Sequence, residues 1–133
     1  MTVRTTPERI TKLAPNEVFV FGSNKAGRHG AGAAKDALKF GATYGHFFGR
    51  MGQCYAIPTK TVTLSVMNLD EIEQCVKVFI RHATEHPKDT FLVTPIGCGL
   101  ATYRPEQIAP MFAKCVQLSN VYLPKSFWDV LIK

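Results

Sequence analysis

The sequence contains no apolar run that approaches the ~18–20 residues of a membrane-spanning helix. Its first ten residues, MTVRTTPERI, lack the apolar core of a signal peptide. No internal repeat, low-complexity segment or linker rich in Pro, Gly and Ser divides the 133 residues. These absences predict one domain over residues 1–133, in a cytoplasmic protein that does not bind a membrane.

Cysteine is sparse and widely spaced. The four cysteines lie at positions 54, 75, 98 and 115, so the chain has no CxxC pair. This spacing excludes a zinc ribbon and gives no disulfide framework. Because 46% of the residues are hydrophobic, a chain of this length can fold around an apolar core without a disulfide or a structural metal ion. We expect no metal site and no cofactor.

Acidic residues are outnumbered by basic ones. Sixteen Lys and Arg against ten Asp and Glu leave a net charge of +6, which favours anionic partners such as a nucleotide or a nucleic acid. The basic residues form no run, and the aromatic residues lie mainly in apolar segments. Stacking aromatics interleaved with cations, which nucleic-acid-binding surfaces use, are therefore lacking. A basic nucleic-acid-binding module remains an alternative to a domain that binds a small nucleotide.

Short apolar runs alternate with segments of helical periodicity. The predicted strands are 17–21, 54–57 (ended by Pro58), 90–94 and 120–123. The predicted helices are 31–40 with Gly41 as C-cap, 68 or 70 to 86, 106–118 with a kink or start at Pro110, and 126–132. Residues 41–53 are predicted to be loop, and 60–67 fit strand or loop. The alternation predicts an α/β layered domain with a mainly parallel sheet.

Segment 22–34, after the first strand, contains glycines at positions 22, 27, 30 and 32. Glycine adopts positive φ and lets a ligand approach the main chain. The helix that follows presents free N–H groups, which favour an anion. No Gly-Lys-Ser/Thr follows, so the segment is not a P-loop, and its spacing is not the Rossmann fingerprint. A turn needed only for close strand–helix packing is the alternative interpretation.

A second glycine loop, Gly-Cys-Gly-Leu-Ala at 97–101, follows strand 90–94 in the same way. The carboxyl ends of parallel strands meet at one edge of a sheet, where ligand crevices form. We therefore expect the two loops to converge and to hold a diphosphate between their backbone amides. Lys25, Arg28 and Lys35 add positive charge near the first loop.

The segments FGSNKAGRHGAGAA (21–34), YAIPT (55–59) and PIGCGLA (95–101) together resemble a macro domain, in particular the small macro-like proteins of bacteria and phages. The resemblance covers about residues 17–41 and 90–124. It implies a three-layer α/β domain in which a mixed, mostly parallel sheet is flanked by helices. It also implies binding of ADP-ribose or a related nucleotide derivative between the glycine loops, and in hydrolytic members the cleavage of an ADP-ribosyl linkage.

The resemblance further assigns residues to roles. It implies that Asn24 contacts the distal ribose and helps to position water, and that Tyr103 places an aromatic ring near that ribose. The implied ligand-binding set is Gly22, Ser23, Asn24, Arg28, Gly30, Ala31, Gly32, Ala33, Ile96, Gly97, Cys98, Gly99, Leu100, Ala101, Thr102 and Tyr103. The Asp that usually receives the adenine amino group is missing, and Glu8 or Glu17 could substitute for it.

Few residues in the loops are suited to catalysis. His29 is the side chain of the first loop that could act as a general base near neutral pH, with Asn24 orienting a water. Cys98 is an alternative nucleophile, because a nearby helix start would lower its pKa. Neither glycine loop holds an Asp or Glu, which leaves no paired-carboxylate chemistry and no magnesium site. A protein that sequesters a nucleotide signal without turnover is the non-catalytic alternative.

Overall fold

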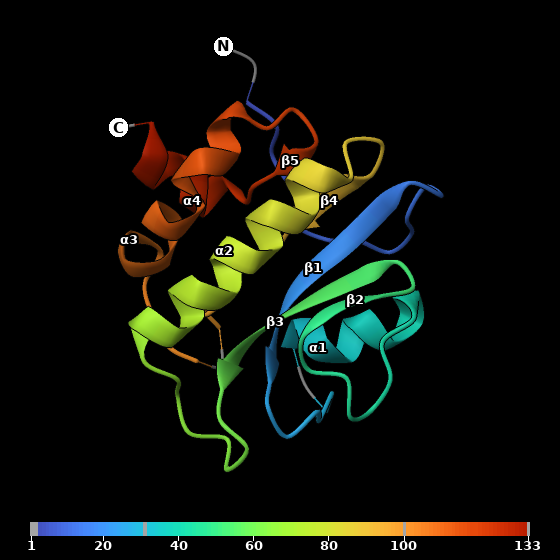
Figure 1. Ribbon diagram of the computed structural model, residues 1–133, viewed down its shortest axis with the longest axis vertical. Helices are drawn as coiled ribbons and strands as arrows, with labels where there is room; N and C mark the ends of the chain where they lie inside the picture. The colour runs from blue at the N-terminus through green and yellow to red at the C-terminus, as the bar shows by residue number, and fades with distance from the viewer. Residues whose placement is uncertain (1–2, 31, 100, 133) are drawn as a thin grey trace.

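The computed structural model describes residues 3–30, 32–99 and 101–132. Within these ranges, five strands form one sheet in the order β2-β3-β1-β4-β5 (Figure 1). The strands are β1 (Glu17–Asn24), β2 (Gly49–Met51), β3 (Cys54–Lys60), β4 (Thr90–Val93) and β5 (Val121–Tyr122). Strand β2 runs antiparallel to β3, and the other pairs are parallel. The predicted α/β class with a mixed, mostly parallel sheet is confirmed.

Helical segments cover both faces of the sheet. They are α1 (Gly32–Ala37) with the 3-10 helix η1 (Leu38–Phe40), α2 (Leu69–Glu85), α3 (Pro105–Ile108) with the 3-10 helix η2 (Ala109–Gln117), and α4 (Lys125–Leu131). Val18 and Val20 of β1 pack with α2, η2 and α4, whereas Phe19 and Phe21 pack with α1 on the opposite face. Because successive side chains of a strand point to opposite faces, the apolar run of β1 is buried on both sides.

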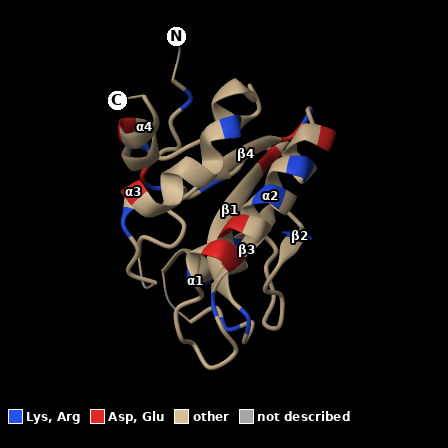
Figure 2. Ribbon diagram, turned by 60° about the vertical axis from the view of Figure 1, so that its left-hand side comes forward, with Lys and Arg blue, Asp and Glu red and all other residues tan. Residues whose placement is uncertain are grey.

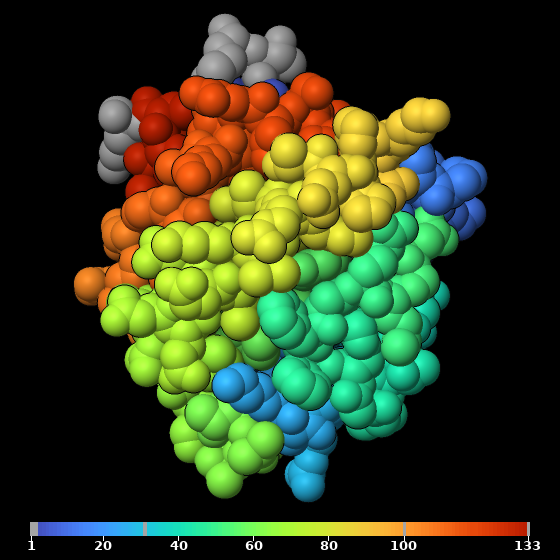
Figure 3. All heavy atoms as spheres, viewed as in Figure 1, coloured from blue at the N-terminus to red at the C-terminus, as the bar shows by residue number. Residues whose placement is uncertain are grey.

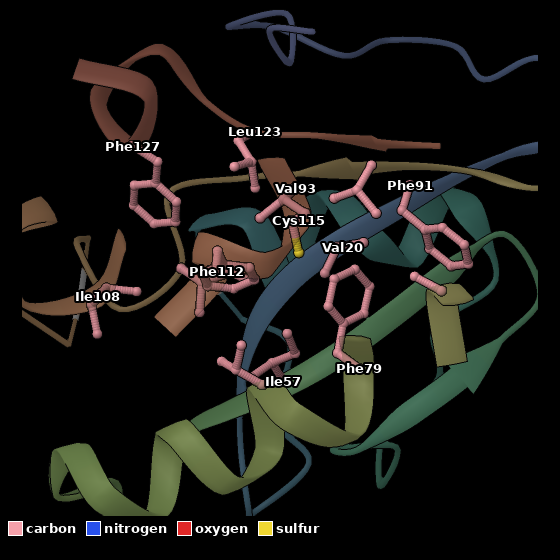
Figure 4. Packing of buried hydrophobic residues seen from close by; sticks show 14 of the residues in the cluster. Val20, Ile57, Phe79, Phe91, Val93, Ile108, Phe112, Cys115, Leu123 and Phe127 are labelled. Atoms are coloured by element: carbon pink, nitrogen blue, oxygen red, sulfur yellow. The ribbon is translucent and has the colours of Figure 1, made fainter. Parts of the chain in front are cut away.

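The larger of the two cores lies beneath α2. The Phe79 ring of α2 lies 5.5 Å from that of Phe91 and 6.2 Å from that of Phe112, measured between ring centroids (Figure 4). Helix α2 begins at the predicted Asn68 cap, whose side chain accepts a hydrogen bond from the Glu71 N–H at 2.8 Å. Figure 3 shows the face that carries α2 filled by side chains, with no deep hollow.

The structure corrects two predictions around β3. The strand does not stop at Pro58 but continues to Lys60. Strand β2 pairs only with residues up to Ala56, so one side of β3 is unpaired at Pro58 and the missing N–H breaks no ladder there. Strand β2 itself lies inside segment 41–53, which was predicted to be loop throughout. Residues 61–66 form a turn, with a single bridge between Lys60 and Val66.

Two predicted helices are shorter or less regular than expected. The helix predicted at 31–40 is α1 followed by η1, and it ends at Gly41, whose φ of +113° fits the predicted C-cap. The helix predicted at 106–118 becomes a 3-10 helix from Ala109, with Pro110 in its first turn, where a missing N–H is tolerated. Within the part of the chain that the structure describes, no helix has the length and apolar character needed to cross a membrane.

Candidate functional site

The chain order of the strands places a crevice between β1 and β4. These strands are parallel neighbours in the sheet. From β1 the chain passes through α1 to β3 on one side, and from β4 it passes through α3 and η2 to β5 on the other. Connections that leave two neighbouring strands in opposite directions leave room at their carboxyl ends, which is where ligands bind in open α/β sheets.

A cleft of about 760 Å³ occupies this position. The volume lies within the usual range of sites for small ligands, roughly 300–1,000 Å³. Gly30 of the first glycine loop and Gly99 of the second both line it, so the two loops converge as expected. The described residues that line the cleft are Gly22, Ser23, Asn24, Arg28, Gly30, Gly32, Ala33, Ala34, Thr59, Lys60, Leu64, Thr94, Pro95, Ile96, Gly97, Cys98, Gly99 and Ala101.

Both loops contribute glycine residues to the cleft wall. Among the hydrogen bonds between described residues, none is donated by the N–H of Gly30, Gly97 or Gly99. The carbonyl of Gly97 accepts the Tyr103 N–H at 2.8 Å, and that of Gly99 accepts the Thr102 N–H at 3.0 Å. The second loop is therefore closed through its carbonyl groups, and no described residue accepts a hydrogen bond from its glycine amides.

The charged side chains among the described lining residues are both cationic, Arg28 and Lys60. Of the other cations predicted near the first loop, Lys25 pairs with Glu71 of α2 at 3.6 Å. Lys35 is exposed on α1 and does not line the cleft. Elsewhere on the surface, Figure 2 shows basic and acidic positions interspersed along α2 and its neighbours. The cleft thus differs from the surface seen in that view in carrying one sign of charge.

The polar side chains at the end of β1 brace the first loop. The Asn24 amide donates to the Arg28 carbonyl at 2.8 Å and accepts the Arg28 N–H at 3.0 Å. The buried Ser23 hydroxyl donates to the Phe47 carbonyl, and the Thr59 hydroxyl donates to the Ser23 carbonyl at 3.3 Å. Asn24 therefore lines the cleft while both of its polar atoms fix the shape of the loop.

Three residues of the expected site lie outside the cleft. His29 is buried between the rings of Phe21 and Tyr44, with its Nε2 2.7 Å from the Thr43 carbonyl oxygen. His29 is buried and does not line the cleft, so its position does not fit the predicted role of general base. Tyr103 donates its hydroxyl to the Met67 carbonyl, and Thr102 is also absent from the described lining. The expected residues Ala31 and Leu100 lie outside the described part of the chain.

Cys98 lines the cleft, but its electrostatic environment is the reverse of the predicted one. Burial, together with the nearby Glu106 carboxylate, raises the pKa of its thiol from an ordinary value of 9.0 to about 11. The predicted lowering by a helix start is therefore wrong. At neutral pH the side chain is a protonated thiol, which is a poor nucleophile.

We expect slow alkylation of Cys98 at pH 7.5. A thiol pKa about two units above normal reduces the reactive thiolate roughly 100-fold relative to an unperturbed thiol. The labelling rate with iodoacetamide, followed by peptide mass spectrometry against free cysteine as control, should rise about tenfold per pH unit up to about pH 11. Complete labelling within minutes at pH 7 would contradict this assignment.

A second cavity of about 760 Å³ adjoins the cleft. Ala33, Thr94 and Pro95 line both. Glu8 lines this second cavity, as does Thr6, whose buried hydroxyl makes no hydrogen bond within the described residues. The alternative carboxylate, Glu17, is excluded because it lies at the opposite end of β1 and accepts the Ala14 N–H at 2.8 Å.

Six described lining residues were not predicted from the sequence. Three of them lie close to predicted residues: Ala34 follows Ala33, and Thr94 and Pro95 precede Ile96. The other three, Thr59, Lys60 and Leu64, lie beyond Pro58, where the strand was predicted to end. Within the described ranges, no three His, Cys, Asp or Glu side chains are grouped so that they could hold a metal ion.

Comparison with known proteins adds information on the fold alone. No family model matches the sequence, and no curated protein matches it. Among solved structures, a protein of unknown function from Bacteroides thetaiotaomicron is similar, with a TM-score of 0.59 and 18% sequence identity. The match covers 81% of this chain and 87% of that one. The α/β architecture is therefore shared with another natural protein.

Proposed function

We propose that the protein binds ADP-ribose or a closely related nucleotide derivative in the cleft between its two glycine loops. One observation carries this proposal: Gly30 and Gly99, 69 positions apart in the sequence, line the same cleft together with Arg28 and Lys60. Backbone amides and two cations, with no carboxylate among the described lining residues, are suited to a diphosphate.

The adjoining cavity supplies a place for the base. A nucleobase carrying an exocyclic amine needs an acceptor, and Glu8 can provide one at the cavity wall. The shared residues Ala33, Thr94 and Pro95 connect this cavity to the glycine loops. An elongated ligand would then lie with its base in the cavity and its diphosphate against the loops.

The cleft supports binding more directly than hydrolysis. Its described lining contains no Asp, Glu or His that could serve as a general base. Asn24, which the resemblance links to a catalytic water, already uses one N–H and its carbonyl oxygen to hold the Arg28 backbone. We therefore favour a protein that sequesters or recognises its nucleotide and releases it unchanged.

Calorimetric titration with ADP-ribose tests the proposal. We expect saturable binding by the wild type. For Lys60→Gln we expect a dissociation constant about 10- to 100-fold larger, because a hydrogen bond to a charged group contributes about 1.5–3 kcal/mol. Lys35→Gln is the matched control, since Lys35 is exposed and outside the cleft, and its affinity should match that of the wild type. Chromatography of the ligand after incubation should recover ADP-ribose intact.

Absence of heat at millimolar ADP-ribose would count against the proposal. Equal weakening by Lys60→Gln and Lys35→Gln would show that the ligand responds to overall charge and not to the cleft. Binding of any oligonucleotide with a steep salt dependence, in the absence of ADP-ribose binding, would favour the nucleic-acid alternative.

A further inference from the structure

Residues 61–66, here called the 61–66 turn, connect cleft residue Lys60 to the start of α2. The Thr61 N–H donates to the Ser65 carbonyl at 2.7 Å, and the Leu64 N–H donates to the Thr61 carbonyl at 2.9 Å. The hydroxyls of Thr61, Thr63 and Ser65 follow one another at 3.0 Å spacings. The turn is therefore tightly bonded although most of it is exposed.

Leu64 has a backbone conformation that leucine rarely adopts. Its φ is +66°, in the left-handed region where Gly and Asn are favoured. Its side chain is 41% exposed and lines the cleft, so burial in the core does not explain the conformation. A strained residue held by a well-bonded turn at a cleft wall suggests a functional constraint on its side chain.

The position of Leu64 relative to the rest of the cleft indicates which part of a ligand it meets. Leu64 lines the cleft but not the adjoining cavity, where the base is placed by the proposed function. The bridge between Lys60, a candidate diphosphate contact, and Val66 closes the turn that carries Leu64, so Leu64 lies in the loop directly beyond Lys60. A group attached beyond the diphosphate, on the side away from the base, would therefore reach Leu64.

We infer that Leu64 is a specificity-determining residue that packs against the sugar attached to the far phosphate. The inference rests on the proposed function. An apolar side chain covers the C–H face of a ribose ring, while a nucleoside diphosphate that lacks this sugar leaves Leu64 without a contact. Leu64 thereby favours a dinucleotide-like or sugar-bearing ligand over a plain nucleoside diphosphate.

Titration of Leu64→Asn with ADP-ribose and with ADP tests this inference. Asn tolerates the left-handed conformation and has a similar size, but it replaces the apolar wall with an amide. We expect ADP-ribose to bind roughly tenfold more weakly, as loss of part of a buried leucine contact implies, and ADP to bind within about twofold of the wild type. The melting temperature should stay level or rise, because backbone strain is relieved.

Val62→Asn is the matched control, since Val62 is 66% exposed in the same turn and does not line the cleft. Its affinities should equal those of the wild type. Unchanged ADP-ribose affinity in Leu64→Asn, or an equal loss for ADP, would overturn the role of Leu64 and leave the proposed function standing. A melting temperature several degrees below that of Val62→Asn would make Leu64 a packing residue. Failure of the wild type to bind ADP-ribose would overturn both proposals.

Discussion

Gly27→Ala is expected to destabilise the protein by about 2–4 kcal/mol, because the new methyl group clashes with the backbone of Gly45, which has no flexible side chain to move aside. Gly27 has a φ of +69°, and a Cβ built on it would lie 2.4 Å from the Gly45 Cα and 2.7 Å from its nitrogen. The Gly45 N–H donates to the Gly27 carbonyl at 2.8 Å, so the two glycines hold the first loop against segment 41–48. Thermal denaturation should show a loss of roughly 10 °C or more.

Gly45→Ala is the control for this prediction. Its φ is +92°, so alanine is strained there as well, but a Cβ would meet no atom within 4 Å. We expect a cost of about 1 kcal/mol, the conformational part of the Gly27 effect alone. If the two variants have the same melting temperature, the close approach of the Gly27 and Gly45 backbones does not exist in solution. Because Gly27 lies between Asn24 and Arg28, its variant should also lose affinity for ADP-ribose.

The edge of the sheet that carries the site was predictable for a simple physical reason. Apolar runs that end in glycine, at 17–21 and 90–94, are typical of buried parallel strands, and the carboxyl ends of such strands share an edge. The convergence of Gly30 and Gly99 required no knowledge of side-chain packing. Backbone geometry alone therefore located the cleft.

Side-chain roles within the cleft were less predictable, because tertiary partners decide them. His29 was predicted to be a base from its place in the loop, but the ring packs into the core beside Phe21. Asn24 lines the cleft as predicted, but its amide also forms two hydrogen bonds with the Arg28 backbone, a structural role that the sequence did not indicate. Lys60 was missed because Pro58 predicted a strand end, and only the short reach of β2 shows why Pro58 is tolerated.

Gly97→Ala should weaken ADP-ribose binding at least tenfold and destabilise the fold by about 2–3 kcal/mol. Gly97 has a φ of +77°, and a Cβ there would lie 3.1 Å from Cδ1 and 3.3 Å from Cγ1 of Ile108. Ile108 is fully buried in the larger core and has little room to shift. The second loop must then move toward the cleft, which displaces the amides proposed to hold the diphosphate.

Gly99→Ala separates the two effects of that substitution. Gly99 lines the same cleft, its φ is not positive, and a Cβ would meet no atom within 4 Å. The free energy of unfolding of this variant should lie within about 0.5 kcal/mol of the wild-type value, as is usual for exposed substitutions. It should nevertheless bind ADP-ribose more weakly, because the methyl group would stand where the proposed diphosphate approaches the backbone. Denaturation curves and titrations of both variants give the measurement. If Gly99→Ala binds ADP-ribose as the wild type does, the diphosphate does not lie against this loop, and the charge of Arg28 and Lys60 must hold it elsewhere in the cleft.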